Sequence, residues 1–133
     1  MVSIDLYWQL LKYGLVGVLN TLVTLLSIFV LMKLLNVSYI ISNAAGYLFG
    51  FTNSFVLNKI WTFRSKGPVG REGILFIAIF LICYGIQLIC LLFFKEIVYI
   101  RIEVATIMAM VVYTGLNFLG NKFITFRSGG ENV

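Results

Sequence analysis

The chain has 133 residues, of which 61% are hydrophobic and only 11% are charged, with a formal net charge of +5. A soluble domain carries about 25% charged residues on average, so this composition excludes one. Four uncharged runs occupy most of the sequence: Tyr13–Met32, Leu34–Asn58, Gly73–Phe94 and Val104–Asn121. A transmembrane helix needs about 20 apolar residues. The sequence therefore predicts an all-α integral membrane protein with four transmembrane helices.

In chain order, the four helices are predicted at about residues 10–32, 39–57, 73–94 and 104–121. The connections are short, so residues 1–133 are predicted to form one domain without an extramembrane part. Pro68 lies between Gly67 and Gly70 in the longest connection, where a turn is expected. The first run is too long for a cleaved signal and lacks a small-residue cleavage site, so we expect it to remain as the first helix.

The orientation is predicted from the basic residues near the helix ends, which are more frequent on the cytoplasmic side. One side holds seven basic residues: Lys12, Lys59, Arg64, Lys66, Arg71, Lys122 and Arg127. The other side holds three, which are Lys33, Lys95 and Arg101. We therefore expect a multi-pass membrane protein with both termini in the cytoplasm.

Several kinds of chemistry have no residues to support them. The sequence has no His and no Cys-x-x-Cys, so we expect no metal and no cofactor. The acidic residues flank the uncharged runs, whereas proton-driven transporters usually place a carboxylate or His at membrane depth. No phosphate-binding loop and no nucleophile with a base is present. The sequence predicts a passive facilitator or a partner protein, not an enzyme, and no nucleic-acid partner.

An internal repeat relates the ends of the second and fourth predicted helices. The segment Phe55–Ser65 matches Phe118–Ser128 at an offset of 63 residues, with seven of eleven positions identical. Each copy closes an even-numbered helix, so the repeat unit is a helical hairpin. Two spans per unit predict two parallel-repeated hairpins, related by an axis along the membrane normal. A duplication without functional content is the simpler alternative.

The repeated residues suggest a binding site. Around a pseudo-twofold axis, the two copies would form a basic, amide-rich collar at the cytoplasmic face, with Lys12 beside it. Its members are Asn58, Lys59, Arg64, Asn121, Lys122 and Arg127. Further amides lie within the apolar runs, where an unpaired amide is costly. Asn20, Asn53 and Asn117 should therefore face one another, as interhelical contacts, or line a polar path.

Small residues recur at every fourth position of the second predicted helix: Ser42, Gly46, Gly50 and Ser54. Ala105 and Ala109 occupy the equivalent positions of the fourth. This spacing lets helix backbones approach closely in lipid. The partner helix can belong to the same chain or to a second copy, so a homodimer is one expectation.

The sequence resembles the GtrA-like family. The resemblance rests on the stretches Lys12–Leu22 and Asn53–Phe63, and above all on Asn58-Lys59-Ile60-Trp61-Thr62-Phe63. It covers essentially the whole chain, including the four-helix count. One departure is Thr24, where many members carry an acidic residue.

The resemblance implies a flippase of the bacterial cell membrane. It would move polyprenyl-phosphate-linked monosaccharides, such as undecaprenyl-phosphate sugars, from the cytoplasmic to the outer leaflet. Membrane glycosyltransferases would use them there to modify polysaccharide or, as in Gram-positive members, wall teichoic acid. The expected partners are this sugar lipid, membrane lipids and a glycosyltransferase. The alternatives are a non-transporting subunit that anchors a glycosyltransferase, and a small pore-forming protein. The last does not account for the duplicated block.

Overall fold

The computed structural model describes residues 2–127, and their side chains from residue 4 onward. Ser128, at the end of the sequence repeat, lies outside the described residues. The chain divides into two compact units, Met1–Arg64 and Ser65–Val133. Each unit is a helical hairpin, and the described residues contain no strand.

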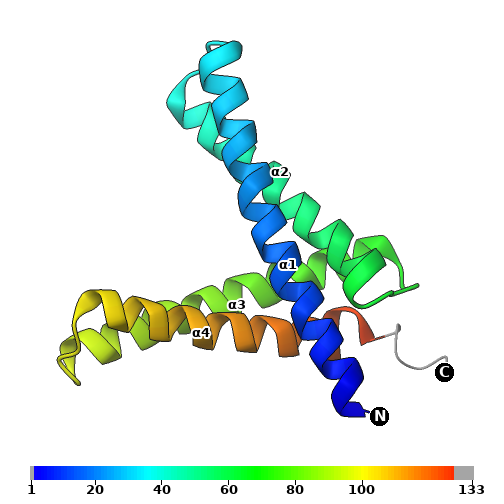
Figure 1. Cartoon of the computed structure of the whole chain (residues 1–133), viewed down its shortest axis with the longest axis vertical. Helices are drawn as coiled ribbons and strands as arrows, with labels where there is room; N and C mark the ends of the chain where they lie inside the picture. Colours follow the sequence, from blue (N-terminus) through cyan, green and yellow to red (C-terminus); the bar gives the residue numbers. More distant parts are fainter. Residues whose placement is uncertain (1, 128–133) are drawn as a thin grey trace. The chain divides into compact units, whose positions relative to one another are not determined.

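The first hairpin contains α1 (Val2–Phe29), which continues into the π-helical segment η1 (Val30–Leu34). The chain then turns, and α2 (Tyr39–Leu57) runs back beside α1 (Figure 1). A second π-helical segment, η2 (Asn58–Thr62), follows α2 without a break and packs against α1.

The second hairpin contains α3 (Val69–Glu96) and α4 (Ile102–Gly120), which lie side by side (Figure 1). The π-helical segment η3 (Asn121–Thr125) follows α4 and packs against α3. Both helices α2 and α4 therefore begin, end and change to a π-helix at positions that differ by the same 63 residues. α3 begins four residues before the predicted start at residue 73.

The two hairpin tips have the same backbone conformation. Asn36 and Tyr99 both adopt the left-handed region, with φ of 53° and 56°. The hydrogen bonds that close the tips also correspond at an offset of 63 residues: Val37 N–H to Leu31 C=O at 2.8 Å, and Ile100 N–H to Phe94 C=O at 3.0 Å. The repeat thus extends beyond the identical residues into segments whose sequences differ.

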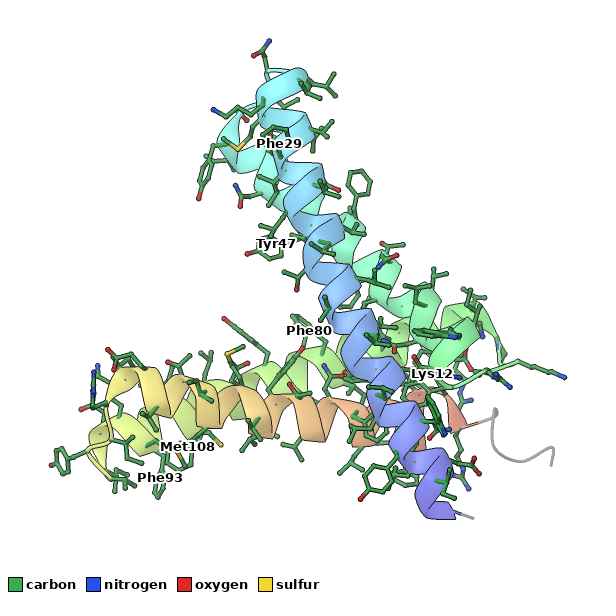
Figure 2. The ribbon with its side chains drawn as sticks, viewed as in Figure 1. Lys12, Phe29, Tyr47, Phe80, Phe93 and Met108 are labelled. Carbon is green, nitrogen blue, oxygen red and sulfur yellow. The ribbon has the colours of Figure 1, made fainter. Side chains whose placement is uncertain are left out.

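Three helical stretches are long and apolar enough to cross a membrane: Ile4–Leu34, Val69–Glu96 and Ile102–Thr125. Large apolar side chains project from the hairpins (Figure 2), and Phe29, Tyr47 and Phe93 are 56%, 67% and 47% exposed. Such surfaces require lipid, because water would solvate them poorly. The chain is a membrane protein with four helices, three of which qualify as spans by length and composition.

The small-residue positions of α2 are the contact surface of the first hairpin. A Cβ atom added at Gly46 would overlap Ile28, and one added at Gly50 would overlap the side-chain oxygen of Thr24. Ser42 is fully buried, as is its counterpart Ala105 in α4. The stripe therefore packs against α1 of the same chain, and its small residues allow the close approach. The expectation of a homodimer stays untested.

We predict that Gly50→Ala destabilises the first hairpin by about 1–3 kcal/mol, the usual cost of overpacking a close contact. The added methyl group would displace Thr24 and come within 2.8 Å of the Asn20 Oδ1 atom. Gly17→Ala is the matched control, because a Cβ there meets no atom within 4 Å. Thermal unfolding in detergent measures both. Equal stability of the two variants would contradict the close packing of α2 on α1.

Candidate functional site

The repeated motif forms the last part of each hairpin, here called the signature ends: residues 58–64 and 121–127. Both have the same pattern of burial. The Asn, Thr and Phe side chains are buried, the Lys is half-buried and the Arg is exposed. The buried members are Asn58, Thr62, Phe63, Asn121, Thr125 and Phe126. The buried side chains of the motif therefore help to pack the hairpin, whereas its lysine and arginine remain accessible.

In the first signature end, α1 supplies two contacts. The Lys12 Nζ atom lies 5.6 Å from the centroid of the Trp61 ring, a cation–π distance. The next residue, Tyr13, packs its ring on Phe63, with centroids 6.3 Å apart and planes at 57°. Lys12 lies on the part of α1 beside the end of α2 (Figure 2). The structure thus brings Lys12 to the motif, as the sequence suggested.

In the second signature end, α3 supplies the equivalent ring. Phe76 packs on Phe126 with centroids 6.1 Å apart and planes at 50°. Phe76 follows Tyr13 by 63 residues, so the aromatic pair is part of the repeat. The Lys122 Nζ atom lies 6.0 Å from the Phe118 ring and 5.7 Å from the Phe123 ring. Here the cation contacts rings of its own helix.

The motif asparagines each donate a hydrogen bond to the side chain four residues earlier in the chain. In α4, the Asn121 side-chain N–H donates to Asn117 Oδ1 at 2.6 Å, and Asn117 donates to the Tyr113 hydroxyl at 2.8 Å. In α2, Asn58 donates to Ser54 Oγ at 3.3 Å. Asn117 is 6% exposed. It therefore acts as a link in a buried ladder rather than as an exposed wall of a path.

Asn20 and Asn53 lie away from the signature ends. Asn20 packs near Gly50 at the α1–α2 contact, and its Oδ1 atom is buried without a hydrogen-bond partner. The Nδ2 atom of Asn53 is also buried and without a hydrogen-bond partner. Each amide therefore has one buried polar atom whose hydrogen-bonding capacity is unused.

Glu72 was counted from the sequence among the acidic residues that flank the apolar runs. The structure places it in the first turn of α3, where it is 1% exposed. The Ser65 hydroxyl donates a hydrogen bond to its carboxylate, and the Gly67 N–H donates to Ser65 Oγ at 3.2 Å. A negative charge at a helix N-terminus also interacts favourably with the helix dipole. Glu72 thus anchors the segment that leads into α3.

Arg64 has an unusual backbone conformation. Its φ is 50°, in the left-handed region that non-glycine residues rarely adopt. An L side chain there costs about 1–2 kcal/mol. Glycine would fit this position better, yet the sequence has an exposed arginine.

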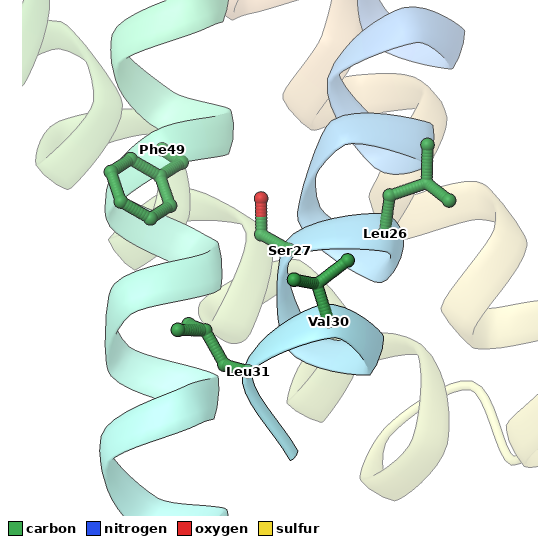
Figure 3. Close-up of a pocket in the computed structure, with 5 residues that line it drawn as sticks. All are labelled: Leu26, Ser27, Val30, Leu31 and Phe49. Carbon is green, nitrogen blue, oxygen red and sulfur yellow. The ribbon is translucent and has the colours of Figure 1, made fainter. Parts of the chain in front are cut away.

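A pocket of about 280 Å³ lies nearer the tip of the first hairpin, away from its signature end. Phe49 of α2 faces Leu26, Ser27, Val30 and Leu31 across it (Figure 3). The lining is apolar apart from the Ser27 hydroxyl. It can receive a hydrocarbon chain but offers no charge for a phosphate.

These features define a small membrane protein made of helical hairpins with a duplicated polar, basic end. The chain belongs to the family described as GtrA/DPMS, transmembrane domain, which matches residues 12–126. The family resemblance is thereby confirmed. The chain is 31% identical over 123 residues to the uncharacterized membrane protein YngA of Bacillus subtilis (strain 168), covering 92% of this chain and 82% of YngA. It is 22% identical to the uncharacterized membrane protein YwcD of the same organism, over 90% and 97% of the two chains.

Proposed function

We propose that the protein is a flippase for polyprenyl-phosphate-linked monosaccharides, which it moves from the cytoplasmic to the outer leaflet. It acts without catalysis, and the products serve the glycosylation of cell-surface polymers such as wall teichoic acid. Membership of the GtrA/DPMS family supports a role with lipid-linked sugars. The observation that carries the proposal is the duplicated end, where a buried amide adjoins a half-buried lysine in each hairpin.

The substrate poses a defined physical problem. Its tail can stay in lipid, whereas its phosphate and sugar hydroxyls must leave water, which is costly without compensating contacts. The cations of the signature ends would pair with the phosphate: Lys59 and Lys122 as point charges, Arg64 and Arg127 through forked donors. Lys12, held over Trp61, would contribute a further charge.

The proposal requires α2 to be the fourth span. α2 and η2 run without interruption from Tyr39 to Thr62, the counterpart of the apolar stretch Ile102–Thr125. Four spans would place both signature ends at one face of the cell membrane, together with both termini. We further propose that the hairpins form a parallel repeat about an axis along the membrane normal.

A topology experiment tests the fourth span. We expect a reporter fused after Val133 to be cytoplasmic and one inserted next to Asn36, at the first hairpin tip, to be external. A reporter next to Tyr99, at the second tip, should also be external. If α2 does not cross the membrane, the second tip and the C-terminal reporter must exchange sides. That exchange would place both signature ends at the outer face, opposite the N-terminus, and would contradict the cytoplasmic loading on which the proposed function depends.

Transport in this direction needs no pump. Moving one negative charge outward is favoured by an inside-negative potential, by about 2.3 kcal/mol per 100 mV. Use of the sugar lipid by a glycosyltransferase at the outer face would remove the product. Both effects act on the substrate rather than on a coupling residue of the protein.

The decisive experiment is reconstitution of the purified chain in liposomes with a short-chain polyprenyl-phosphate sugar. We expect movement between leaflets that depends on the protein and speeds up with an inside-negative potential. No movement by the correctly folded chain would reject the flippase. The alternative, an accessory subunit that positions a glycosyltransferase, would then be supported if the chain still co-purified with such an enzyme.

A further inference from the structure

Each hairpin buries two polar side chains whose oxygen atom lacks a hydrogen-bond partner. Asn58 and Thr62 begin and end η2, and Asn121 and Thr125 begin and end η3. The four side chains are 1%, 3%, 0% and 1% exposed, in that order. Each Asn Oδ1 and each Thr Oγ1 atom is buried without a hydrogen-bond partner. Residues four apart lie roughly one turn apart in a π-helix, so each pair shares one side of its segment.

Other threonines of the chain behave differently and serve as internal controls. The hydroxyls of Thr21, Thr52 and Thr106 each donate to the backbone carbonyl four residues earlier, at 3.0, 2.8 and 2.7 Å. This bond is the usual way for a helical threonine to satisfy its hydroxyl. Thr62 and Thr125 differ from these three, because their hydroxyls are buried and make no such bond.

The difference coincides with π-helical geometry. The carbonyl four residues before Thr62 belongs to Asn58, and it accepts the N–H of Phe63 at 2.9 Å. In the second hairpin, the Asn121 carbonyl accepts the N–H of Phe126 at 2.8 Å. Both threonine hydroxyls therefore lie in π-helical segments and are left without a partner. A π-helical turn inside an α-helix frequently marks a functional site.

Chance does not explain four such atoms at repeated positions. About 90% or more of buried backbone polar groups, and the large majority of buried side-chain polar atoms, have partners. The third π-helical segment, η1, is the contrast, because it buries no residue and its sequence, Val30–Leu34, is apolar apart from Lys33. Among the three π-helical segments, the two at the signature ends therefore bury polar atoms without partners and η1 does not.

We propose that the pairs Asn58–Thr62 and Asn121–Thr125 are subsites for the hydroxyl groups of the carried sugar. The inference rests on the proposed function and adds the site that distinguishes a sugar-bearing lipid from a sugar-free one. An amide oxygen accepts a hydrogen bond, and a threonine hydroxyl donates and accepts. This uncharged set suits a neutral polyol, while the adjacent Lys59 and Lys122 suit the phosphate.

The subsites are closed in this structure, so a sugar reaches them only after the π-helical segment moves away from α1 or α3. Each π-helical segment has only five residues, so few backbone hydrogen bonds have to break when it moves. Thr62 and Thr125 would then exchange a buried, unpaired state for bonds to the sugar. Neither residue was part of the site expected from the sequence.

The test compares two ligands on the purified protein in lipid nanodiscs by native mass spectrometry: undecaprenyl phosphate and undecaprenyl-phosphate N-acetylglucosamine. We expect the wild type to prefer the sugar-bearing lipid. Thr62→Val with Thr125→Val should reduce that preference roughly tenfold, since two neutral hydrogen bonds are lost. Binding of undecaprenyl phosphate should stay unchanged. Thr52→Val with Thr106→Val is the matched control and should keep the preference.

Thr62→Ser with Thr125→Ser keeps both hydroxyls and should restore the preference. If the double Val variant does not fold, Thr62→Ala with Thr125→Ala takes its place in the test. Retained preference in a folded Val or Ala pair overturns the inference, because the hydroxyls are then only unpaired or water-bound. That result leaves the proposed function intact. If the wild type binds neither lipid, the proposed function fails and the inference fails with it.

Discussion

Neutralising both lysines of the signature ends, by Lys59→Gln with Lys122→Gln, is expected to reduce surface-polymer glycosylation strongly. Each lysine is half-buried beside a buried amide, where it can meet a phosphate at the head-group boundary. Losing a hydrogen bond to a charged group costs about 1.5–3 kcal/mol, or roughly ten- to a hundredfold in affinity. Glycosylation is measured on isolated cell wall, with protein abundance measured in parallel.

The matched control removes the same charge at the hairpin tips, by Lys33→Gln with Lys95→Gln. These lysines lie at the last turns of η1 and α3, away from the signature ends. The control should glycosylate normally. Its orientation should not change, because removing charges from the side with fewer basic residues strengthens the basic-residue bias. If the signature-end variant is present at normal abundance and glycosylates normally, its two lysines serve only as insertion signals.

Arg64 permits a separate comparison of stability and activity. Arg64→Gly relieves the left-handed backbone and should stabilise the chain by about 1 kcal/mol while removing the guanidinium. We expect it to lower glycosylation in spite of the gain in stability, which excludes misfolding as the cause. Arg64→Lys should rescue glycosylation only partly if the phosphate uses a forked contact.

The sequence could predict the helices and the repeated motif because both depend on local pattern. Uncharged runs mark the helices, and the identity of Asn58-Lys59 with Asn121-Lys122 marks the repeat. The part of the repeat outside this motif could not be predicted from sequence identity. Tyr13 and Phe76 correspond only because each packs on a motif phenylalanine, a contact between helices that identity does not reveal.

Two other features were beyond the sequence for physical reasons. A carboxylate at the edge of an apolar run is usually solvated, so burial of Glu72 was not expected. Thr62 and Thr125 stood within the motif, but a helical threonine often bonds its own backbone. Their unused hydroxyls lie in π-helical segments, for which the sequence carried no recognised signal.

Loss of the Ser65–Glu72 hydrogen bond is expected to destabilise the second hairpin at the start of α3. The carboxylate is 1% exposed and accepts from the Ser65 hydroxyl. Ser65→Ala should therefore cost about 1.5–3 kcal/mol, as for other hydrogen bonds to a charged group. Lys66→Ala is the matched control, because this exposed residue lies in the same segment.

Glu72→Leu should cost more than Ser65→Ala, because it also removes the negative charge that the N-terminus of α3 favours. The double variant should cost less than the sum of the two, by about 1–3 kcal/mol, since the single variants remove one shared contact. Thermal unfolding of the four proteins in detergent gives this coupling energy. Because Ser65 follows Arg64 directly, the destabilised variants should also lower glycosylation by loosening the chain at the first signature end. Additive costs would mean that Glu72 is buried for a reason other than its bond with Ser65.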